Sequence, residues 1–94
     1  MHEAIRIGII GDFDPDFRPH AATEEALRHA ADALAVGLEV RWLPTPSLLD
    51  PESEKALETF DGLWASPGSP YRSLEGALRA IRFARERSWP FVAT

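Results

Sequence analysis

The fold of this chain is decided by the stretch Gly62-Leu-Trp-Ala-Ser-Pro-Gly-Ser-Pro-Tyr-Arg-Ser-Leu-Glu-Gly76, which changes from an apolar run to a turn and then to a helix start. The stretch predicts a strand, a loop and a helix in that order. Such a junction leaves backbone N–H groups unpaired at the helix N-terminus, and together with the helix dipole these groups attract negative charge. A bound anion, or an oxyanion formed during a reaction, would be held here.

Apolar runs elsewhere predict three more strands, so that strands are expected over 5–10, 38–43, 63–65 and 91–93. Helices are predicted from residue 21 to a cap at Gly37, from Asp50 or Ser53 through Glu58, and after the N-cap Ser73. The expected apolar sides are Ala22, Ala26, Ala30, Ala33 and Leu34 in the first helix, and Leu74, Ala77, Leu78, Ile81 and Ala84 in the last.

This alternation of strands and helices predicts parallel pairing through right-handed crossovers. The fold class is therefore α/β, a three-layer flavodoxin-like parallel sheet in the order 2-1-3-4 with helices on both faces. Ligands of such sheets bind beyond the carboxyl ends of the strands, between the first and third strands. The loops that follow those two strands are the acidic run after Gly11 and the central loop of the opening stretch.

Composition limits the function classes. The chain has 94 residues, which suits one domain, and its formal charge of −5 argues against a nucleic-acid partner. It contains no cysteine, so disulfides, thiolate metal sites and cysteine nucleophiles are excluded within these residues. The apolar runs are too short to span a bilayer and the N-terminus lacks the layout of a signal peptide, so no membrane partner and a cytoplasmic location are expected.

The acidic loop after the first predicted strand offers Asp12, Asp14 and Asp16. It superficially resembles the Asp-x-Asp of haloacid-dehalogenase-like phosphatases, and it could equally suggest a divalent metal site. Pro15 stands where the phosphatase pattern has a small residue, and Phe17 stands where a calcium loop needs glycine. Solvated loop acids are the favoured interpretation, and an Asp-dependent phosphatase site at Asp12 and Asp14 stays open as an alternative.

The remaining chemistry-bearing residues predict structure. His20 and His29 show no metal-ligand spacing, so a helix-start residue and a surface imidazole are expected. Trp42, Trp64 and Trp89 are predicted to pack the sheet against its helices. No metal and no cofactor is predicted.

In the central loop, Gly68 lets the backbone turn freely and lets a ligand come close. On its shape alone the loop is either an anion or oxyanion site or a plain strand-to-helix turn. Its residues Pro-Gly-Ser-Pro-Tyr-Arg, the helix that follows and the closing Trp-Pro-Phe resemble the class I glutamine amidotransferase domain of CTP synthase. Ile-Gly-Ile-Ile-Gly at 7–11 resembles the first strand of that domain. The resemblance covers nearly the whole chain and is nearest to bacterial proteins that carry this domain without the synthetase part.

The resemblance implies hydrolysis of glutamine to glutamate and ammonia by a Cys-His-Glu triad, which in the ligase CTP synthase supplies ammonia for CTP formation in pyrimidine biosynthesis. It implies that Gly68 or Ser69 supplies an oxyanion-hole amide and that Pro70, Tyr71 and Arg72 lie beside the substrate glutamine. In the family the nucleophilic cysteine follows the fourth strand within a Cys-Gly motif. Residues 1–94 are therefore expected to be the N-terminal half of the domain and to be inactive alone.

Two departures from the family pattern stand out: the loop has Gly68-Ser69-Pro70 instead of Gly-Gly-Phe, and Asp12 replaces a basic residue. A second hypothesis from another class is a non-catalytic flavodoxin-like binding module. Its fourth strand would be an exposed edge, open to self-association.

Overall fold

The computed structural model describes residues 4–13, 16, 18–66 and 71–93. Four parallel strands form one sheet in the order β2-β1-β3-β4. The strands are β1 (Ile5–Ile10), β2 (Leu38–Leu43), β3 (Gly62–Ala65) and β4 (Phe91–Ala93). The predicted flavodoxin-like sheet and its strand order are confirmed, and β3 begins one residue earlier than predicted.

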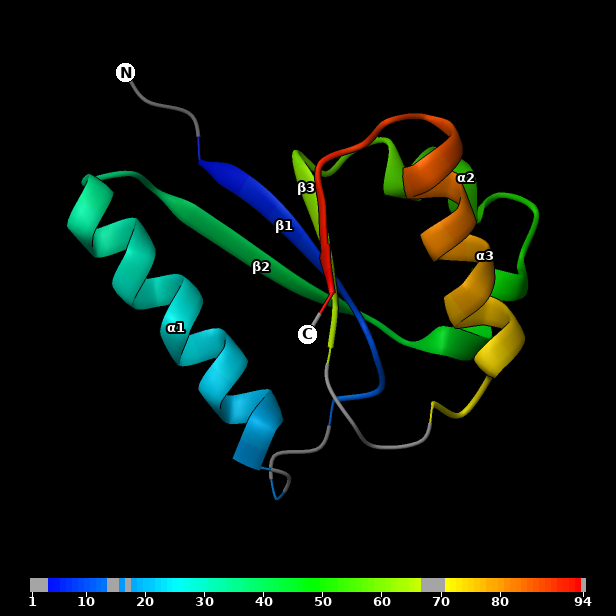
Figure 1. Ribbon diagram of the computed structural model, residues 1–94, viewed down its shortest axis with the longest axis horizontal. Coiled ribbons are helices and arrows are strands. Elements are labelled where there is room, and N and C mark those ends of the chain that lie inside the picture. Colours follow the sequence, from blue (N-terminus) through cyan, green and yellow to red (C-terminus); the bar gives the residue numbers. More distant parts are fainter. Residues whose placement is uncertain (1–3, 14–15, 17, 67–70, 94) are drawn as a thin grey trace.

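Helices cover both faces of the sheet (Figure 1). The helix α1 (Arg18–Leu34) lies on one side, and α3 (Leu74–Glu86) lies on the other with the short α2 (Ser53–Leu57). A 3₁₀ helix, η1 (Thr45–Leu49), follows β2 and was not predicted from the sequence. None of the described helices is long and apolar enough to cross a membrane.

The main core lies between the sheet and α3. Its buried residues come from every layer on that side: Ile10, Leu43, Leu48, Leu57, Phe60, Leu63, Ala77, Ala80, Phe83 and Ala84. Two of the predicted packing tryptophans behave as expected. The ring of Trp89 lies tilted against that of Phe83, with centroids 5.5 Å apart, and its Nε1 donates to the Phe60 carbonyl oxygen at 2.9 Å. Trp42 of β2 packs against α1.

The predicted apolar side of α3 is only partly correct. Ala77 and Ala84 are buried, but Leu74 and Leu78 keep 62% and 50% of their surface exposed. Small side chains face the sheet because they let the helix approach it closely, and Phe83 fills the remaining space. The helix is therefore rotated away from the orientation that its largest residues suggest.

The predicted orientation of α1 is wrong. The helix begins at Arg18 rather than at residue 21, and it buries His20, Thr23 and Ala31 while Leu34 stays 71% exposed. The expected alanine side faces outward. Alanine gains little from burial, so the ring and polar contacts of α1 with β2 decide which side faces the sheet.

Both long helices end on a residue with positive φ that is not glycine. At the end of α1 this residue is Ala35 (φ 55°), and the N–H of Val36 donates to the Ala31 carbonyl oxygen at 3.0 Å. At the end of α3, Ser88 (φ 51°) has the same role. Each end is a Schellman motif. The prediction of Gly37 as the cap was wrong because Ala35 adopts the left-handed conformation two residues earlier.

Candidate functional site

The carboxyl ends of β1, β2 and β3 meet the start of α3 at one edge of the sheet. Backbone hydrogen bonds join these ends: Gly11 N–H donates to the Leu43 carbonyl oxygen, and Ser66 N–H donates to that of Ile10, each at 3.1 Å. This is the edge at which the sequence places the ligand site of the fold.

Asp12 ties three of these segments together. Its Oδ1 accepts from the backbone N–H of Thr45 at 2.9 Å, and its Oδ2 accepts from the Thr45 hydroxyl at 2.7 Å and from the Arg72 N–H at 2.9 Å. The Thr45 Oγ1 in turn accepts from the Ser73 N–H at 2.8 Å. We call Asp12, Thr45, Arg72 and Ser73 the Asp12 clamp. It links the end of β1, the start of η1 and the start of α3.

The clamp favours the ionised form of Asp12. Burial alone would raise the pKa of this carboxyl, but the hydrogen bonds from Arg72 and Thr45 and the Arg72 charge outweigh burial, so the pKa lies below its usual value. The favoured prediction that Asp12 is a solvated loop acid was wrong. Since both carboxylate oxygens accept hydrogen bonds from the protein, the geometry does not favour a phosphatase nucleophile here.

Around the clamp, glycines let neighbouring segments of the chain come very close to each other. Thr45 is fully buried, and Gly76 in the first turn of α3 lies so close that a Cβ there would overlap the Thr45 carbonyl oxygen. A Cβ at Gly11 would overlap the Ser66 hydroxyl oxygen. The predicted N-cap of α3 is confirmed, because the Ser73 Oγ accepts from the Gly76 N–H at 3.1 Å.

Tyr71 closes the central loop from its far end. Its hydroxyl donates to the Ser66 carbonyl oxygen at 3.1 Å, so the residues on either side of 67–70 are hydrogen-bonded to each other. Burial, and to a smaller extent the charge of Asp12, raises the pKa of Tyr71. The hydroxyl is thereby kept protonated, as a donor must be.

The structure places only some of the predicted site residues. Gly68, Ser69 and Pro70 lie outside the described residues, as does Asp14. Tyr71 and Arg72 lie at the sheet edge, where Tyr71 is half-buried and Arg72 is exposed. Asp16 is exposed.

The histidines lie where the sequence predicts. His20 is buried in the first turn of α1 with its ring 4.8 Å from that of Trp42, and His29 is exposed. Within the described ranges no three His, Asp or Glu side chains gather as metal ligands would.

Thr45 was missed by the sequence analysis, although it holds both Asp12 and Ser73. Two signals point to it in retrospect. Proline stands on either side of it, which favours a tight turn, and the isolated Gly76 inside a helix indicates that another backbone comes close.

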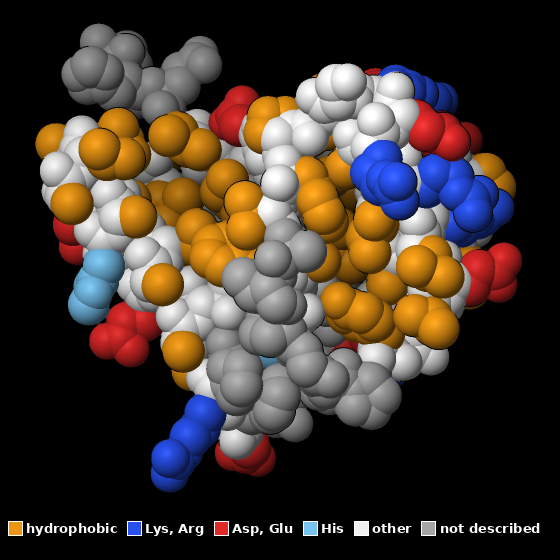
Figure 2. Space-filling model, viewed as in Figure 1, with side chains coloured by type: hydrophobic (Ala, Val, Ile, Leu, Met, Phe, Trp, Pro, Cys, Tyr) orange, Lys and Arg blue, Asp and Glu red, His pale blue; other side chains and the backbone are white. Residues whose placement is uncertain are grey.

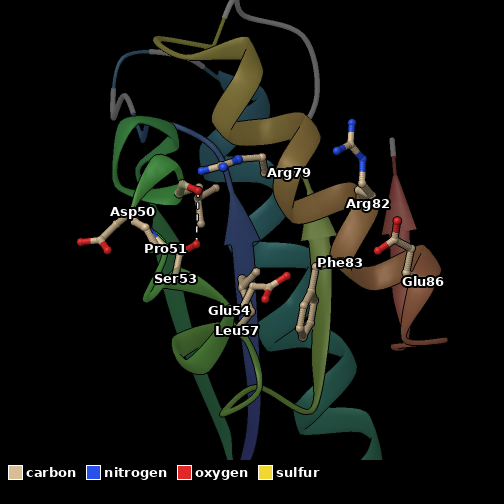
Figure 3. A pocket seen from close by; sticks show the side chains of 10 residues that line it. Asp50, Pro51, Ser53, Glu54, Leu57, Arg79, Arg82, Phe83 and Glu86 are labelled. Carbon is tan, nitrogen blue, oxygen red and sulfur yellow. Dashed lines mark hydrogen bonds between the residues drawn. The ribbon is translucent and has the colours of Figure 1, made fainter.

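A separate cleft of about 420 Å³ lies between α2 and α3 (Figure 3). Arg79 and Phe83 from α3 face Glu54 and Leu57 from α2. Arg79 donates to the Leu49 carbonyl oxygen at 2.6 Å, and Glu54 lies 3.9 Å from Arg87, so side chains around the cleft are used in holding the helices together. The cleft shares no residue with the clamp.

Comparison with solved structures shows which class of domain this fold resembles. The glutaminase domain of Trypanosoma brucei CTPS, solved with bound acivicin, is similar with a TM-score of 0.83 and 26% identity, over 96% of this chain and 36% of that chain. The described architecture is thus similar, in fold and sequence, to part of a glutaminase domain. No protein-family model matches the chain.

Curated relatives are named CTP synthase. The enzyme of Acidobacterium capsulatum is 37% identical over 87 residues, which are 93% of this chain, and that of Synechococcus sp. is 33% identical over 90 residues, or 96% of this chain. The chain spans 16% of the length of these relatives. In sequence and fold it is similar to part of the glutamine amidotransferase domain of CTP synthase, as the sequence analysis expected.

Proposed function

We propose that residues 1–94 form the N-terminal half of a cytoplasmic glutamine amidotransferase domain of the CTP synthase type, which provides the glutamine-binding side of the site. The complete domain would hydrolyse glutamine and deliver ammonia for an amination such as CTP formation. The observation that carries this proposal is the similarity in fold and sequence to the glutaminase domain of Trypanosoma brucei CTPS, with a TM-score of 0.83 over 96% of this chain. The Asp12 clamp fixes the start of α3 beside the carboxyl end of β1, at the edge where ligands of such sheets bind.

In this proposal the backbone amides of Gly68 and Ser69 are donors to the oxyanion, and Pro70, Tyr71 and Arg72 lie beside glutamine. The hydrogen bond between Tyr71 and Ser66 supports it, since it sets the distance between the two ends of the 67–70 segment. These 94 residues contain no cysteine to act as the nucleophile, so the chain alone is expected to bind the substrate without turning it over.

Titration of the ¹⁵N-labelled chain with L-glutamine tests the binding role. We expect amide shifts at Ser69, Arg72 and Ser73, and no release of glutamate. Ser69→Pro removes one proposed amide donor and should abolish the shifts at neighbouring residues, whereas Ser69→Ala keeps the amide and is the matched control. Shifts confined to other parts of the sheet, or equal binding by both variants, would contradict the assignment of the loop.

The reading frame after the codon for Thr94 tests the domain proposal independently. A longer frame is expected to continue close to Cys-Gly-Gly, the family's nucleophile motif. An unrelated continuation would count against the amidotransferase proposal.

The outer edge of β4 supports a second candidate, an interaction module that associates with itself through this strand. Among the described strands β4 pairs only with β3, and Val92 is 53% exposed. If β4 is the contact, size-exclusion chromatography shows a defined oligomer that Val92→Asp dissociates. A mass unchanged by that substitution would exclude β4 as the contact.

A further inference from the structure

The second edge of the sheet, formed by β2, presents unpaired backbone groups. Gly37 and Leu43 direct their carbonyl oxygens toward β1, where they accept from Ile5 N–H at 3.0 Å and from Gly11 N–H at 3.1 Å. Because successive residues of a strand direct their backbone groups to opposite sides, those of Leu38, Val40 and Trp42 point away from β1. Within the described part of the chain β2 pairs with β1 alone, and these outward groups have no hydrogen-bond partner.

The side chains of β2 alternate in a self-complementary pattern. Glu39 and Arg41 are exposed on the α3 side of the sheet, and the apolar Leu38, Val40 and Trp42 are half-buried on the α1 side. Glu39 lies 3.5 Å from Arg6 but keeps 52% of its side chain exposed. Arg41 forms no ion pair with any residue that the structure describes.

We propose that this edge pairs with the β2 edge of a second copy of the chain, antiparallel and about a two-fold axis at Val40. Val40 then lies opposite the copy's Val40, and Leu38 lies opposite the copy's Trp42. Each of these is a pair in which both residues exchange N–H···O bonds, so every outward backbone group of the three residues gains a partner.

The charges select this register. With Val40 on the axis, Glu39 lies opposite the copy's Arg41 at the closer, non-hydrogen-bonded position, and the two-fold axis repeats the pair. A shift of the register by two residues in one direction places Glu39 opposite Glu39 of the second copy. The same shift in the other direction places Arg41 opposite Arg41 of the second copy. Like charges directly opposite each other are destabilising, so both shifted registers are disfavoured.

The space beside this edge suits the arrangement. A cleft of about 410 Å³ lies between α1 and β2. It is lined by the apolar Ala31, Val36, Leu38 and Val40 and by the charged Glu24, Arg28 and Asp32. It leaves room for side chains of the second copy on the α1 side. Each copy contributes the same β2 edge to the interface, so no such edge is left for a third copy and the assembly is a dimer.

Sedimentation velocity on the 94-residue chain, over a series of concentrations, tests the proposal by charge reversal. The unaltered chain should form a dimer, and Arg41→Glu should weaken it about 30-fold or more, because two attractive pairs become repulsive. Glu39→Arg should act likewise. Arg85→Glu makes the same charge change on α3 and should leave the dimer unchanged.

Mixing the two variants makes the test independent of folding defects. Arg41→Glu carries two acids on the edge and Glu39→Arg carries two arginines, so each weakens its own dimer while the mixture should form a heterodimer. A monomeric parent chain, a dimer insensitive to Arg41→Glu, or a mixture that stays monomeric would each overturn the proposal.

Cross-linking distinguishes the two edges of the sheet. The chain has no cysteine, so Val40→Cys introduces a single thiol on the proposed axis, where opposing Cα atoms lie about 5.5 Å apart and within disulfide range. Mild oxidation should link this variant into dimers but leave Val92→Cys, on the edge strand β4, largely unlinked. Efficient linkage of Val92→Cys alone would move the interface to β4 and overturn the assignment to β2.

Discussion

The helices α3 and α1 cover opposite faces of one sheet, and they are attached to it by different kinds of contact. The inner face of α3 is almost fully buried, with Ala77, Ala80 and Phe83 at most 2% exposed. The inner face of α1 buries His20 and Thr23 and is joined to β2 by a hydrogen bond from Trp42. Close apolar packing thus fixes α3 and the loop before it, whereas α1 depends on a few polar and ring contacts.

Figure 2 shows the consequence on one face of the molecule, where hydrophobic side chains remain visible between the α1 side and the α3 side. Alternation along the strands places Trp64 and Val92 on the α1 side of the sheet, and both are incompletely buried. The α1 side therefore leaves apolar surface of β3 and β4 uncovered by the described residues. This contrast between the two faces can be tested by mutation.

The largest effect is expected at the contact between α3 and Thr45. Gly76→Ala would force a Cβ into the Thr45 carbonyl oxygen, so the helix must move and the free energy of unfolding should fall by about 3 kcal/mol or more. Gly37→Ala, after α1, adds a Cβ at ordinary contact distance from Ala4 and should change it by less than about 0.5 kcal/mol. Urea denaturation measures both. Equal losses would show that the close approach of Gly76 to Thr45 does not restrict the position of α3.

The Asp12 clamp should give the next largest effect. Asp12→Ala removes a charged acceptor from three donors and should cost about 2 kcal/mol near neutral pH. Because the pKa of Asp12 is lowered in the folded protein, its stabilisation is present above the pKa of the unfolded chain and is lost as the pH falls through the folded value.

Urea denaturation at pH 7 and in acid below the folded pKa measures this dependence. The difference between the parent chain and Asp12→Ala should shrink on acidification. Asp32→Ala on the exposed side of α1 is the control and should change little at either pH. A gap that persists in acid would mean that the carboxylate charge does not stabilise the clamp.

The contrast between the faces also shows what the sequence could predict. The strands were placed almost to the residue because β-branched runs and the Gly and Pro between them are local signals. The clamp was not predicted, since it joins Asp12 to Thr45 across 33 residues and Thr45 to Ser73 across 28. The same holds for α1, whose inner face is chosen by Trp42 on a neighbouring strand rather than by the spacing of its own alanines.

On the α1 side, a smaller loss is expected from Trp42→Phe. It removes the Nε1 donor that contacts the Glu24 carboxylate at 2.5 Å while keeping a ring beside His20, so about 1 kcal/mol should be lost. Glu24→Gln retains an acceptor and is the matched control, with a loss below about 0.5 kcal/mol. Hydrogen exchange should show faster opening of α1 in Trp42→Phe with α3 unchanged. Equal acceleration in α3 would mean that the two layers open together.

The smallest effects are expected at the two helix ends, and they test whether both layers unfold as one unit. Ala35 and Ser88 adopt positive φ, which costs a residue with a side chain free energy that glycine avoids. Ala35→Gly and Ser88→Gly should each stabilise their own helix by about 0.5–1 kcal/mol, because the two hydrogen-bonded ends have the same geometry. Ser88→Gly should appear in full in the global free energy of unfolding. Ala35→Gly should do so only if α1 unfolds together with the sheet. A gain seen only in the hydrogen exchange of α1 would show that this helix opens before the rest, as expected from its few contacts with the sheet.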